Sequence, residues 1–165
     1  MRNSFLIFVL TFGVLLFGCK PEPSGTLEVE FYNSSSASIS ILKSGIGDTL
    51  ETYFTLLSAN DVFTISESQM GEGVSSLFGG IIPADSLIVV FNDSLKMVHI
   101  RFVEGSGGSS QFEGRNEIIW RNQPRSLMNL DSYTQEDRGD NRNEHIIARY
   151  YFTEEDLEYA IGIYE

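Results

Sequence analysis

Hydrophobic and polar residues alternate along much of the chain, which is the pattern of β-strands with one buried face. At the start of this pattern Leu27, Val29 and Phe31 point to one side, and Glu28 and Glu30 point to the other. Similar alternation, or a short apolar run, predicts further strands downstream. Together the predicted strands cover residues 26–32, 38–42, 50–56, 62–65, 87–91, 95–103, 118–120, 127–133 and 144–152.

Two hairpins and one central strand can be placed from the same pattern. The first two strands flank Asn-Ser-Ser-Ser at residues 33–36, so we expect them to pair as a hairpin. Residues 87–91, LIVVF, form an unbroken apolar run that predicts a central strand buried on both faces. Asn92 and Asp93 then predict a tight turn, after which the chain returns as the next strand.

The last residues predict a short helix. Thr153 can cap its N-terminus, and the acidic residues at 154–156 suit the positive end of the helix dipole. Leu157, Ala160 and Ile161 then fall on one apolar face. The strands and this helix together predict a mainly β fold, an antiparallel β-sandwich with a short C-terminal helix.

Three segments between the strands are predicted to be loops. Residues 66–80 and 104–114 are rich in glycine and serine and lack periodicity. Residues 134–143 are strongly charged, which favours a solvated loop. The strands, loops and terminal helix form a single predicted β-rich domain at residues 26–165.

The first 18 residues have the layout of an export signal. Arg2 precedes an apolar run at residues 5–17, interrupted only by Thr11 and Gly13. A helix needs about 20 apolar residues to span the hydrocarbon of a bilayer, and this run ends sooner. We therefore predict a signal helix at residues 1–18. The sequence KPEPSG that follows it predicts an extended tether, which with Cys19 covers residues 19–25.

Leu16-Phe17-Gly18-Cys19 resembles the lipobox of bacterial lipoproteins, although Phe17 departs from the small residue usual at its position. The resemblance implies cleavage before Cys19, a diacylglyceryl thioether on its sulfur and an acyl chain on the new N-terminus. Several acyl chains anchor a protein stably, whereas one does so only marginally. Cys19 is the only cysteine and can form no disulfide within the chain. An ordinary buried thiol is the weaker alternative, and Lys20 points to the outer membrane in the general lipoprotein pattern.

A wider resemblance covers nearly the whole mature chain. Asn33-Ser34 follows the first predicted strand, the Asn92-Asp93 turn joins the central hairpin, and an aromatic last strand runs into FTEED at residues 152–156. This order is similar to that of small bacterial lipoproteins of the Bacteroidota type. The resemblance implies an envelope location and a β-rich domain, and it carries no activity that can be transferred.

Composition narrows the classes of function. The 165 residues carry a formal net charge of −12, and 42% of them are hydrophobic, including 12 Phe and 7 Tyr. Such a chain can bury a core without help from a metal or a disulfide. The negative charge repels nucleic acid and anionic lipid headgroups, so we expect no nucleic-acid partner.

Residues suited to catalysis or metal binding are few. His99 and His145 are each predicted to lie on the exposed face of a strand, and neither has a second His or Cys at zinc spacing. Residues 136–144 are rich in oxygen ligands but lack EF-hand spacing, and their Arg138-Gly139-Asp140 tripeptide is also ordinary loop sequence. The chain contains neither G-x-S-x-G nor a P-loop motif. We expect no enzymatic activity, no metal and no cofactor.

Thr49, Ser86 and Ser94 each follow an aspartate and precede a leucine. This tripeptide resembles the acceptor of O-linked glycans in Bacteroidota. Asp-Ser and Asp-Thr are also ordinary turn sequences, and the two interpretations are evenly balanced.

Trp120 is the candidate contact for a ligand, because it lies close to predicted loops. Several tyrosines could extend it into a platform for a carbohydrate or peptide: Tyr133, Tyr150, Tyr151, Tyr159 and Tyr164. Packing in the core explains most of these aromatic residues equally well.

These features predict a protein of the cell envelope that is anchored in the outer membrane through lipid on Cys19. Its expected role is that of a non-enzymatic binding or accessory module with a protein or glycan partner. A subunit of an envelope complex is the alternative, and a hydrolase is a weaker one.

Overall fold

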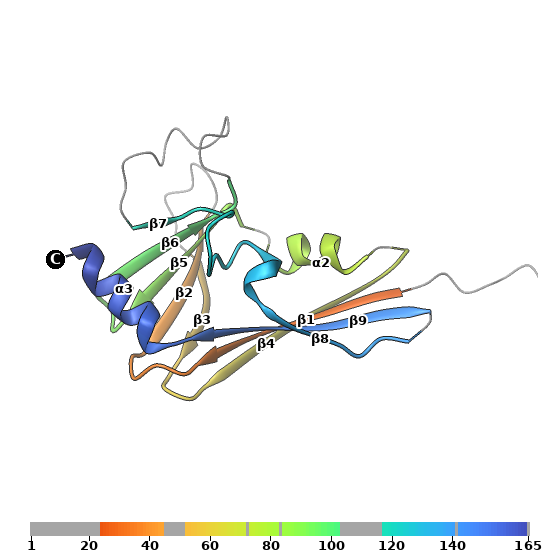
Figure 1. Ribbon diagram of the computed structural model, residues 1–165, viewed down its shortest axis with the longest axis horizontal. Coiled ribbons are helices and arrows are strands. Elements are labelled where there is room, and N and C mark those ends of the chain that lie inside the picture. Colours follow the sequence, from red (N-terminus) through yellow and green to blue (C-terminus); the bar gives the residue numbers. More distant parts are fainter. Residues whose placement is uncertain are drawn as a thin grey trace, which may run out of the picture.

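The computed structural model describes residues 24–44, 52–71, 73–82, 84–102, 117–140 and 142–164. They form two mixed β-sheets and two α-helices, with strand orders β4-β1-β9-β8 and β3-β2-β5-β6-β7 (Figure 1). The elements are β1 (Ser24–Asn33), β2 (Ile39–Ser44), β3 (Thr52–Leu57), β4 (Val62–Met70), α2 (Val74–Ile81), β5 (Ser86–Phe91), β6 (Leu95–Ile100), β7 (Ile118–Ile119), the 3₁₀ helix η2 (Leu130–Ser132), β8 (Thr134–Asp137), β9 (Asn143–Phe152) and α3 (Glu154–Tyr164).

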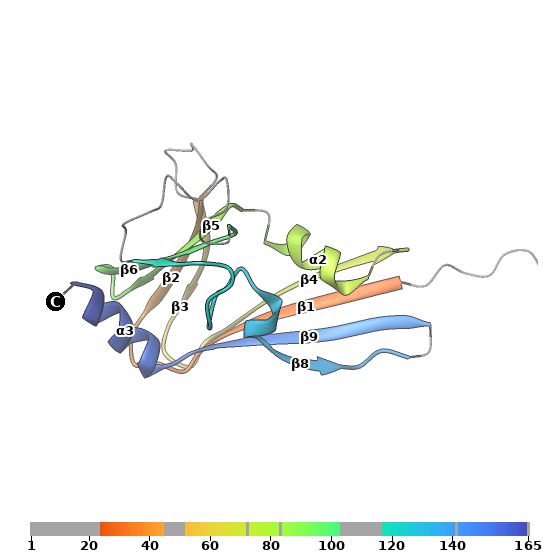
Figure 2. The ribbon, with the colours of Figure 1, turned by 45° about the horizontal axis from the view of Figure 1, so that its top comes forward.

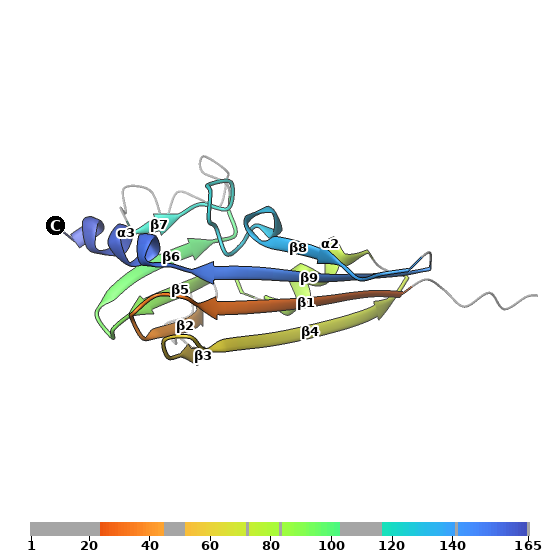
Figure 3. The same cartoon turned by 60° about the horizontal axis from the view of Figure 1, so that its bottom comes forward.

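The first sheet is organised around β1, which lies between β4 and β9 (Figure 3). Leu27, Val29 and Phe31 are fully buried, while Glu28 and Glu30 lie on the outer face of the sheet. The predicted alternation of this strand is confirmed. Because β1 begins at Ser24, residues 24 and 25 belong to the sheet and not to the predicted tether.

The predicted hairpin between the first two strands is wrong, because β1 and β2 lie in different sheets. The chain turns between the sheets at Asn33, whose side chain is 1% exposed. Its Nδ2 donates to the carbonyl oxygens of Ala37 and Leu57, at 2.7 and 3.2 Å. Its Oδ1 accepts from the backbone N of Ser35 at 3.0 Å. A buried amide therefore holds a corner where turn-forming residues alone predict a hairpin.

The prediction of a wholly antiparallel fold is also wrong. β1 pairs in parallel with β9, and β6 pairs in parallel with β7. A parallel pair needs a long connection between its strands, and β1 and β9 come from opposite ends of the described chain. Local alternation predicts that a segment is a strand but carries no information about a partner so far away.

The second sheet is apolar on both of its faces. Every residue of β5 is buried, as predicted for a central strand, and Leu87, Val89 and Phe91 face the first sheet. Asn92 and Asp93 have φ values of 49° and 58°, which confirms the predicted tight turn. On the far side lies a second apolar cluster, made by Leu42, Ile88, Val90, Val98, Ile100, Ile118 and Trp120.

The main core lies between the two sheets and is rich in aromatic rings. Phe31 of β1 lies 6.1 Å from Phe54 of β3 and 6.4 Å from Phe152 of β9, measured between ring centroids. Phe91 of β5 meets the same Phe152 ring edge-on at 6.4 Å. Such contacts join strands of both sheets into one core.

The segment predicted as a loop at residues 66–80 forms ordered elements instead. β4 continues to Met70, and α2 follows from Val74. Figure 2 shows α2 lying along the first sheet. Its buried residues Val74, Leu77, Phe78 and Ile81 belong to the main core. They recur at helical spacing, so the glycines and serines between them concealed an amphipathic helix.

Two other segments differ from their predictions. Residues 127–133 form turns and η2, not a strand, and residues 134–137 form the edge strand β8, not a loop. The C-terminal helix α3 is confirmed, with Ala160 buried, although Ile161 on its predicted apolar face is 39% exposed. The predicted signal helix at 1–18, residues 19–23 of the tether and the predicted loop at 104–114 lie outside the described residues.

Candidate functional site

An irregular stretch of chain, residues 120–133, connects β7 in the second sheet to β8 in the first. We call it the crossing segment. Ser126, Leu127 and Met128 at its centre are at most 4% exposed. Buried backbone N–H and C=O groups need partners, and this stretch has no neighbouring strand to supply them. Side chains of β6 and β9 and of the segment itself supply them instead.

His99 of β6 is one of these partners. It is fully buried, and its Nδ1 accepts a hydrogen bond of 3.1 Å from the backbone N of Leu127. Nδ1 is therefore unprotonated and the proton of the neutral ring lies on Nε2, which has no hydrogen-bond partner within the described chain. Burial, with a smaller effect from the nearby charge of Arg125, lowers the pKa of His99 to about 3. His99 is thus a neutral acceptor that holds the crossing segment.

The exposed position predicted for His99 is wrong. The prediction took Val98 and Ile100 as the inward residues, and both are indeed buried, but in the second apolar cluster. His99 faces the main core on the opposite side of the strand. When both faces of a sheet are covered, the alternation of apolar residues no longer identifies the outer face.

Two tyrosines also hold this segment: Tyr150 comes from β9, and Tyr133 is the last residue of the segment itself. The Tyr133 hydroxyl donates to the carbonyl oxygen of Leu127 at 3.0 Å, and the Tyr150 hydroxyl donates to that of Arg125 at 2.9 Å. Burial raises the pKa of Tyr133 well above its ordinary value and raises that of Tyr150 as well. Both hydroxyls remain protonated donors at any physiological pH.

Arg125 stands where the crossing segment meets α3. Its φ of 62° lies in the left-handed region, which is uncommon for a residue with a side chain. The guanidinium binds both carboxylate oxygens of Asp156, with Nε 2.7 Å from Oδ1, and Nη2 donates to the carbonyl oxygen of Tyr151 at 2.8 Å. Burial acts to lower the pKa of Arg125, but the bonds from Asp156 outweigh it and raise the pKa overall.

Asp156 is 5% exposed and has a second partner at the start of α3. Its Oδ2 accepts a hydrogen bond of 2.8 Å from the backbone N of Thr153. One carboxylate therefore ties the N-terminus of α3 to the crossing segment. Backbone strain that surrounding contacts maintain is concentrated at functional sites, which draws attention to the surface around Arg125.

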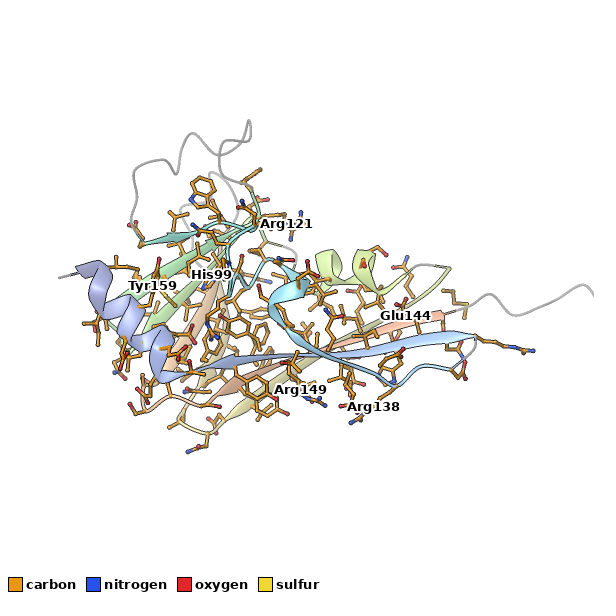
Figure 4. All side chains as sticks on the ribbon, in the orientation of Figure 1. His99, Arg121, Arg138, Glu144, Arg149 and Tyr159 are labelled. Carbon is orange, nitrogen blue, oxygen red and sulfur yellow. The ribbon has the colours of Figure 1, made fainter. Side chains whose placement is uncertain are left out.

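A pocket of about 410 Å³ opens beside this ion pair, between α3, the crossing segment and the ends of β6 and β7. Its size falls within the range of about 300–1,000 Å³ typical of small-molecule sites. Figure 4 shows Tyr159 projecting from α3 on this side of the molecule. The residues that give the pocket its chemistry are Met97, Ile119, Gln123, Arg125, Glu155 and Tyr159.

The pocket combines an apolar floor with a polar rim. Met97 and Ile119 are 1% and 7% exposed, and Tyr159 adds an aromatic ring that is 51% exposed. Gln123 Oε1 accepts a hydrogen bond of 2.9 Å from the backbone N of Trp120, so its NH₂ group is the part that can bind a ligand. The charge of Arg125 is matched by Asp156, and Glu155 leaves the rim negative.

The aromatic residues proposed as a platform are not brought together. Trp120 is 6% exposed and belongs to the second apolar cluster, and Tyr133 and Tyr150 are buried in the main core, as their core-packing interpretation predicts. Tyr151 is 39% exposed and stacks on Tyr32 at 4.9 Å on the outer face of the first sheet. Only Tyr159 lines the pocket, and the side chain of Tyr164 lies outside the described residues.

His145 lies on the outer face of the first sheet, where its Nε2 is 2.9 Å from Glu28 Oε1. Arg138 binds Glu136 at 2.7 Å near the exposed turn that joins β8 to β9. Asp140 accepts hydrogen bonds from the backbone N of Arg142 and of Asn143, which lower its pKa. Over the described ranges, His, Cys, Asp and Glu form no group of three that could hold a metal ion.

The predicted modification sites fall in different surroundings. Cys19 and Thr49 lie outside the described residues, so lipid on Cys19 stays a prediction. Ser86 is 8% exposed, and its hydroxyl donates to the carbonyl oxygen of Ser44 at 3.3 Å. Ser94 is exposed in the turn between β5 and β6. Of the two described serines, Ser94 is the one that a transferase could reach.

The pocket residues Gln123, Arg125 and Asp156 were missed by sequence analysis. Asp156 was assigned to the start of a helix, which is correct, but its partner Arg125 is 31 residues away. The available signal for this site was the Gln-Pro-Arg sequence at residues 123–125, because a proline between polar residues indicates a turn. It gave no indication that α3 would lie against that turn.

Comparisons with protein families, with curated proteins and with solved structures find no match to this chain. Within the part of the chain that the structure describes, no helix has the length and apolarity needed to cross a membrane. The function is therefore inferred from the geometry and chemistry of the pocket.

Proposed function

We propose that this protein is a lipid-anchored binding module of the bacterial cell envelope, which takes a small ligand in the pocket beside α3. The export signal and the lipobox ending in Cys19 support the anchor. The pocket supports the binding role, and its size together with its apolar floor and polar rim is the observation that carries the proposal.

The rim of the pocket selects the charge of the ligand. Arg125 is neutralised by Asp156, so Glu155 contributes an unbalanced negative charge. Met97, Ile119 and the Tyr159 ring suit a flat apolar body. The ligand class that fits is a small neutral or cationic molecule with an aromatic or alicyclic ring.

A pair of probes with the same ring and opposite charge tests this selection. Tryptamine and indole-3-acetate would be titrated into the full chain in detergent and followed by calorimetry. We expect saturable binding of tryptamine and at least tenfold weaker binding of indole-3-acetate. Glu155→Gln should reduce that preference. Equal affinity for the two probes, or binding of neither, would overturn the proposed ligand class.

Two exposed tyrosines provide a matched pair of variants. Tyr159→Ala removes the aromatic wall and should weaken tryptamine binding roughly three- to tenfold. Tyr151→Ala removes an exposed ring from the outer face of the first sheet. That ring does not line the pocket, and the backbone carbonyl that Arg125 binds is kept, so the affinity should be unchanged. If the two variants behave alike, the pocket is not the binding site.

The anchor is tested separately from the pocket. Radioactive palmitate should label the protein expressed in a Gram-negative host, and Cys19→Ser should abolish the label and release the protein from the membrane fraction. Ligand binding should persist in the Cys19→Ser protein. An unlabelled wild-type protein would contradict the anchor and leave the binding proposal to stand on its own measurement.

A further inference from the structure

A second, smaller hollow lies on the other side of the crossing segment. It measures about 100 Å³ and is formed by one face of α2, the end of β6 and the start of the crossing segment. Its lining includes Ser75, Gly79, Arg101, Arg121 and Met128. This volume is well above the roughly 10–15 Å³ that holds one water and well below that of a drug-sized site. It suits a small ion or a single polar group.

Two arginines line this hollow, and they come from different elements. Arg101 follows β6, and its Nη2 donates to the carbonyl oxygen of Ile82 while its backbone N donates to Asp85 O at 2.9 Å. Arg121 follows Trp120, and its backbone N donates to Phe102 O at 3.1 Å. These hydrogen bonds hold the backbone of both arginines in place. Figure 4 shows Arg121 near the top of the second sheet.

The charges of these two arginines are not matched by described carboxylates. Arg125, Arg138 and Arg149 each bind a carboxylate oxygen within 2.7 Å. Among the described residues, no such ion pair is found for Arg101 or Arg121, and no acidic residue lines the hollow. The chain as a whole carries a net charge of −12. Within the described ranges, two arginines that line one hollow without a carboxylate therefore stand out against the negative charge of the chain.

The remaining lining leaves room for an anion. Gly79 of α2 is exposed, and a Cβ built on it would lie 4.0 Å from Arg101 Nη1. Any larger side chain at position 79 would therefore extend over the guanidinium. Ser75, one turn earlier on the helix, is exposed and adds a hydroxyl that can donate. Met128 is buried at the floor. Guanidinium and hydroxyl donors around a small space match the oxygens of a tetrahedral anion.

We infer that the hollow between α2 and the crossing segment binds a phosphate or sulfate group, with Arg101 and Arg121 as its principal ligands. The group can belong to a soluble molecule or to a lipid headgroup, and the oxygen chemistry is the same in both cases. The site is separate from the pocket beside α3, and it stands or falls independently of that proposal.

Titration of the full chain in detergent with inorganic phosphate, followed by calorimetry and by NMR of the arginine side chains, tests the inference. We expect saturable binding that sulfate displaces and that moves the Arg101 and Arg121 signals. Arg121→Gln should weaken the binding at least tenfold, because charged hydrogen bonds are among the strongest. Arg142→Gln removes an exposed arginine from the β8–β9 turn and serves as the control.

Arg121→Gln is the preferred variant, because no hydrogen bond of the Arg121 side chain to another described residue is found, so the fold should tolerate the change. Gly79→Leu gives an independent measurement, since it should block the hollow without removing a charge. Gly162→Leu is its control, because nothing lies within 4 Å of a Cβ at position 162 of α3. Binding that is absent, or unchanged in both Arg121→Gln and Gly79→Leu, would overturn the inference.

Vesicles identify the source of the anion. With the Cys19→Ser protein, which lacks the proposed lipid attachment point, cosedimentation with phosphatidylglycerol vesicles that Arg121→Gln abolishes, and that phosphatidylcholine vesicles do not give, would support a lipid headgroup. Phosphate binding without cosedimentation would support a soluble ligand, which the net charge of −12 favours, because it repels an anionic bilayer. Vesicle binding that Arg121→Gln leaves intact, with no phosphate binding, would count against the site.

Discussion

The outer faces of the two sheets differ in their chemistry: one is charged and the other is apolar. On the first sheet the outer face is a network of charges, in which Arg149 binds Glu30 and Glu136, each at 2.7 Å. The second sheet has an apolar outer face, with Ile100 fully buried in the second cluster. The crossing segment, which leaves this sheet after β7, brings Arg121 and Arg125 close to its strands. The contrast teaches that the two proposed ligand sites lie beside the sheet with the apolar outer face.

The largest effect on stability is expected from two separate variants, each of which places one lysine on the outer face of one sheet. Ile100→Lys buries an unpaired charge and should lower the free energy of unfolding by about 4 kcal/mol or more. Thr64 lies on the exposed face of the first sheet opposite Glu30. Thr64→Lys should therefore change the free energy of unfolding by less than about 0.5 kcal/mol. Urea denaturation measures both values. Similar losses in the two variants would remove the distinction between the faces.

The next effect concerns the ion pair that joins α3 to the crossing segment. Asp156→Asn keeps the size of the side chain but removes the charge that binds Arg125, and it should cost about 2–3 kcal/mol. This is at the low end for breaking a buried pair, because the Arg125 side chain is 43% exposed. Denaturant unfolding gives the value. Glu154→Gln on the same helix turn is the control, and it should cost much less because Glu154 is exposed.

A somewhat smaller effect should follow pH through His99. Its pKa is about 3 in the folded protein against an ordinary value of 6.5, so between these values the unfolded chain binds a proton that the folded protein does not. Stability is therefore lost as the pH falls from 6.5 towards 3, by roughly 1.4 kcal/mol per unit. His99→Asn keeps an acceptor for Leu127 and cannot be protonated.

The difference in stability between wild type and His99→Asn isolates this contribution, because the carboxylates titrate in both proteins. This difference in the free energy of unfolding should become smaller by roughly 2 kcal/mol as the pH falls from 6.5 to 5. A difference that stays constant over this range would show that His99 is not held neutral by burial.

The smallest effect is expected on the outer face of the first sheet. Hydrogen bonds from Arg138 and Arg149 lower the pKa of Glu136 to about 2. Arg149 and its partners are only partly buried and face solvent, where such pairs contribute little. Arg149→Gln should lower the melting temperature by no more than a few degrees, and 1 M salt should remove most of the difference. A large loss that is insensitive to salt would contradict the surface character of the network.

Local sequence pattern predicts a residue's surroundings correctly where its neighbours along the chain decide them. Alternation placed Leu27 and Glu28 on the correct faces of β1, and the apolar run at β5 indicated burial on both sides. It failed where distant segments meet. The partner of β1 is β9, the face of His99 depends on what covers the second sheet, and Arg125 meets Asp156 only after α3 has packed. Each of these features depends on tertiary contacts, which the local sequence pattern does not predict.

The position of β1 has a consequence for the order in which the protein can form. Its ladder with β9 joins residues as far apart as Ser24 and Asn143, so β1 keeps a free edge until nearly the last described strand has been synthesised. Closing so long a loop is slow relative to local pairing. The first sheet therefore cannot be completed until nearly the whole chain is available, and the same exposed edge makes truncated chains prone to associate with each other.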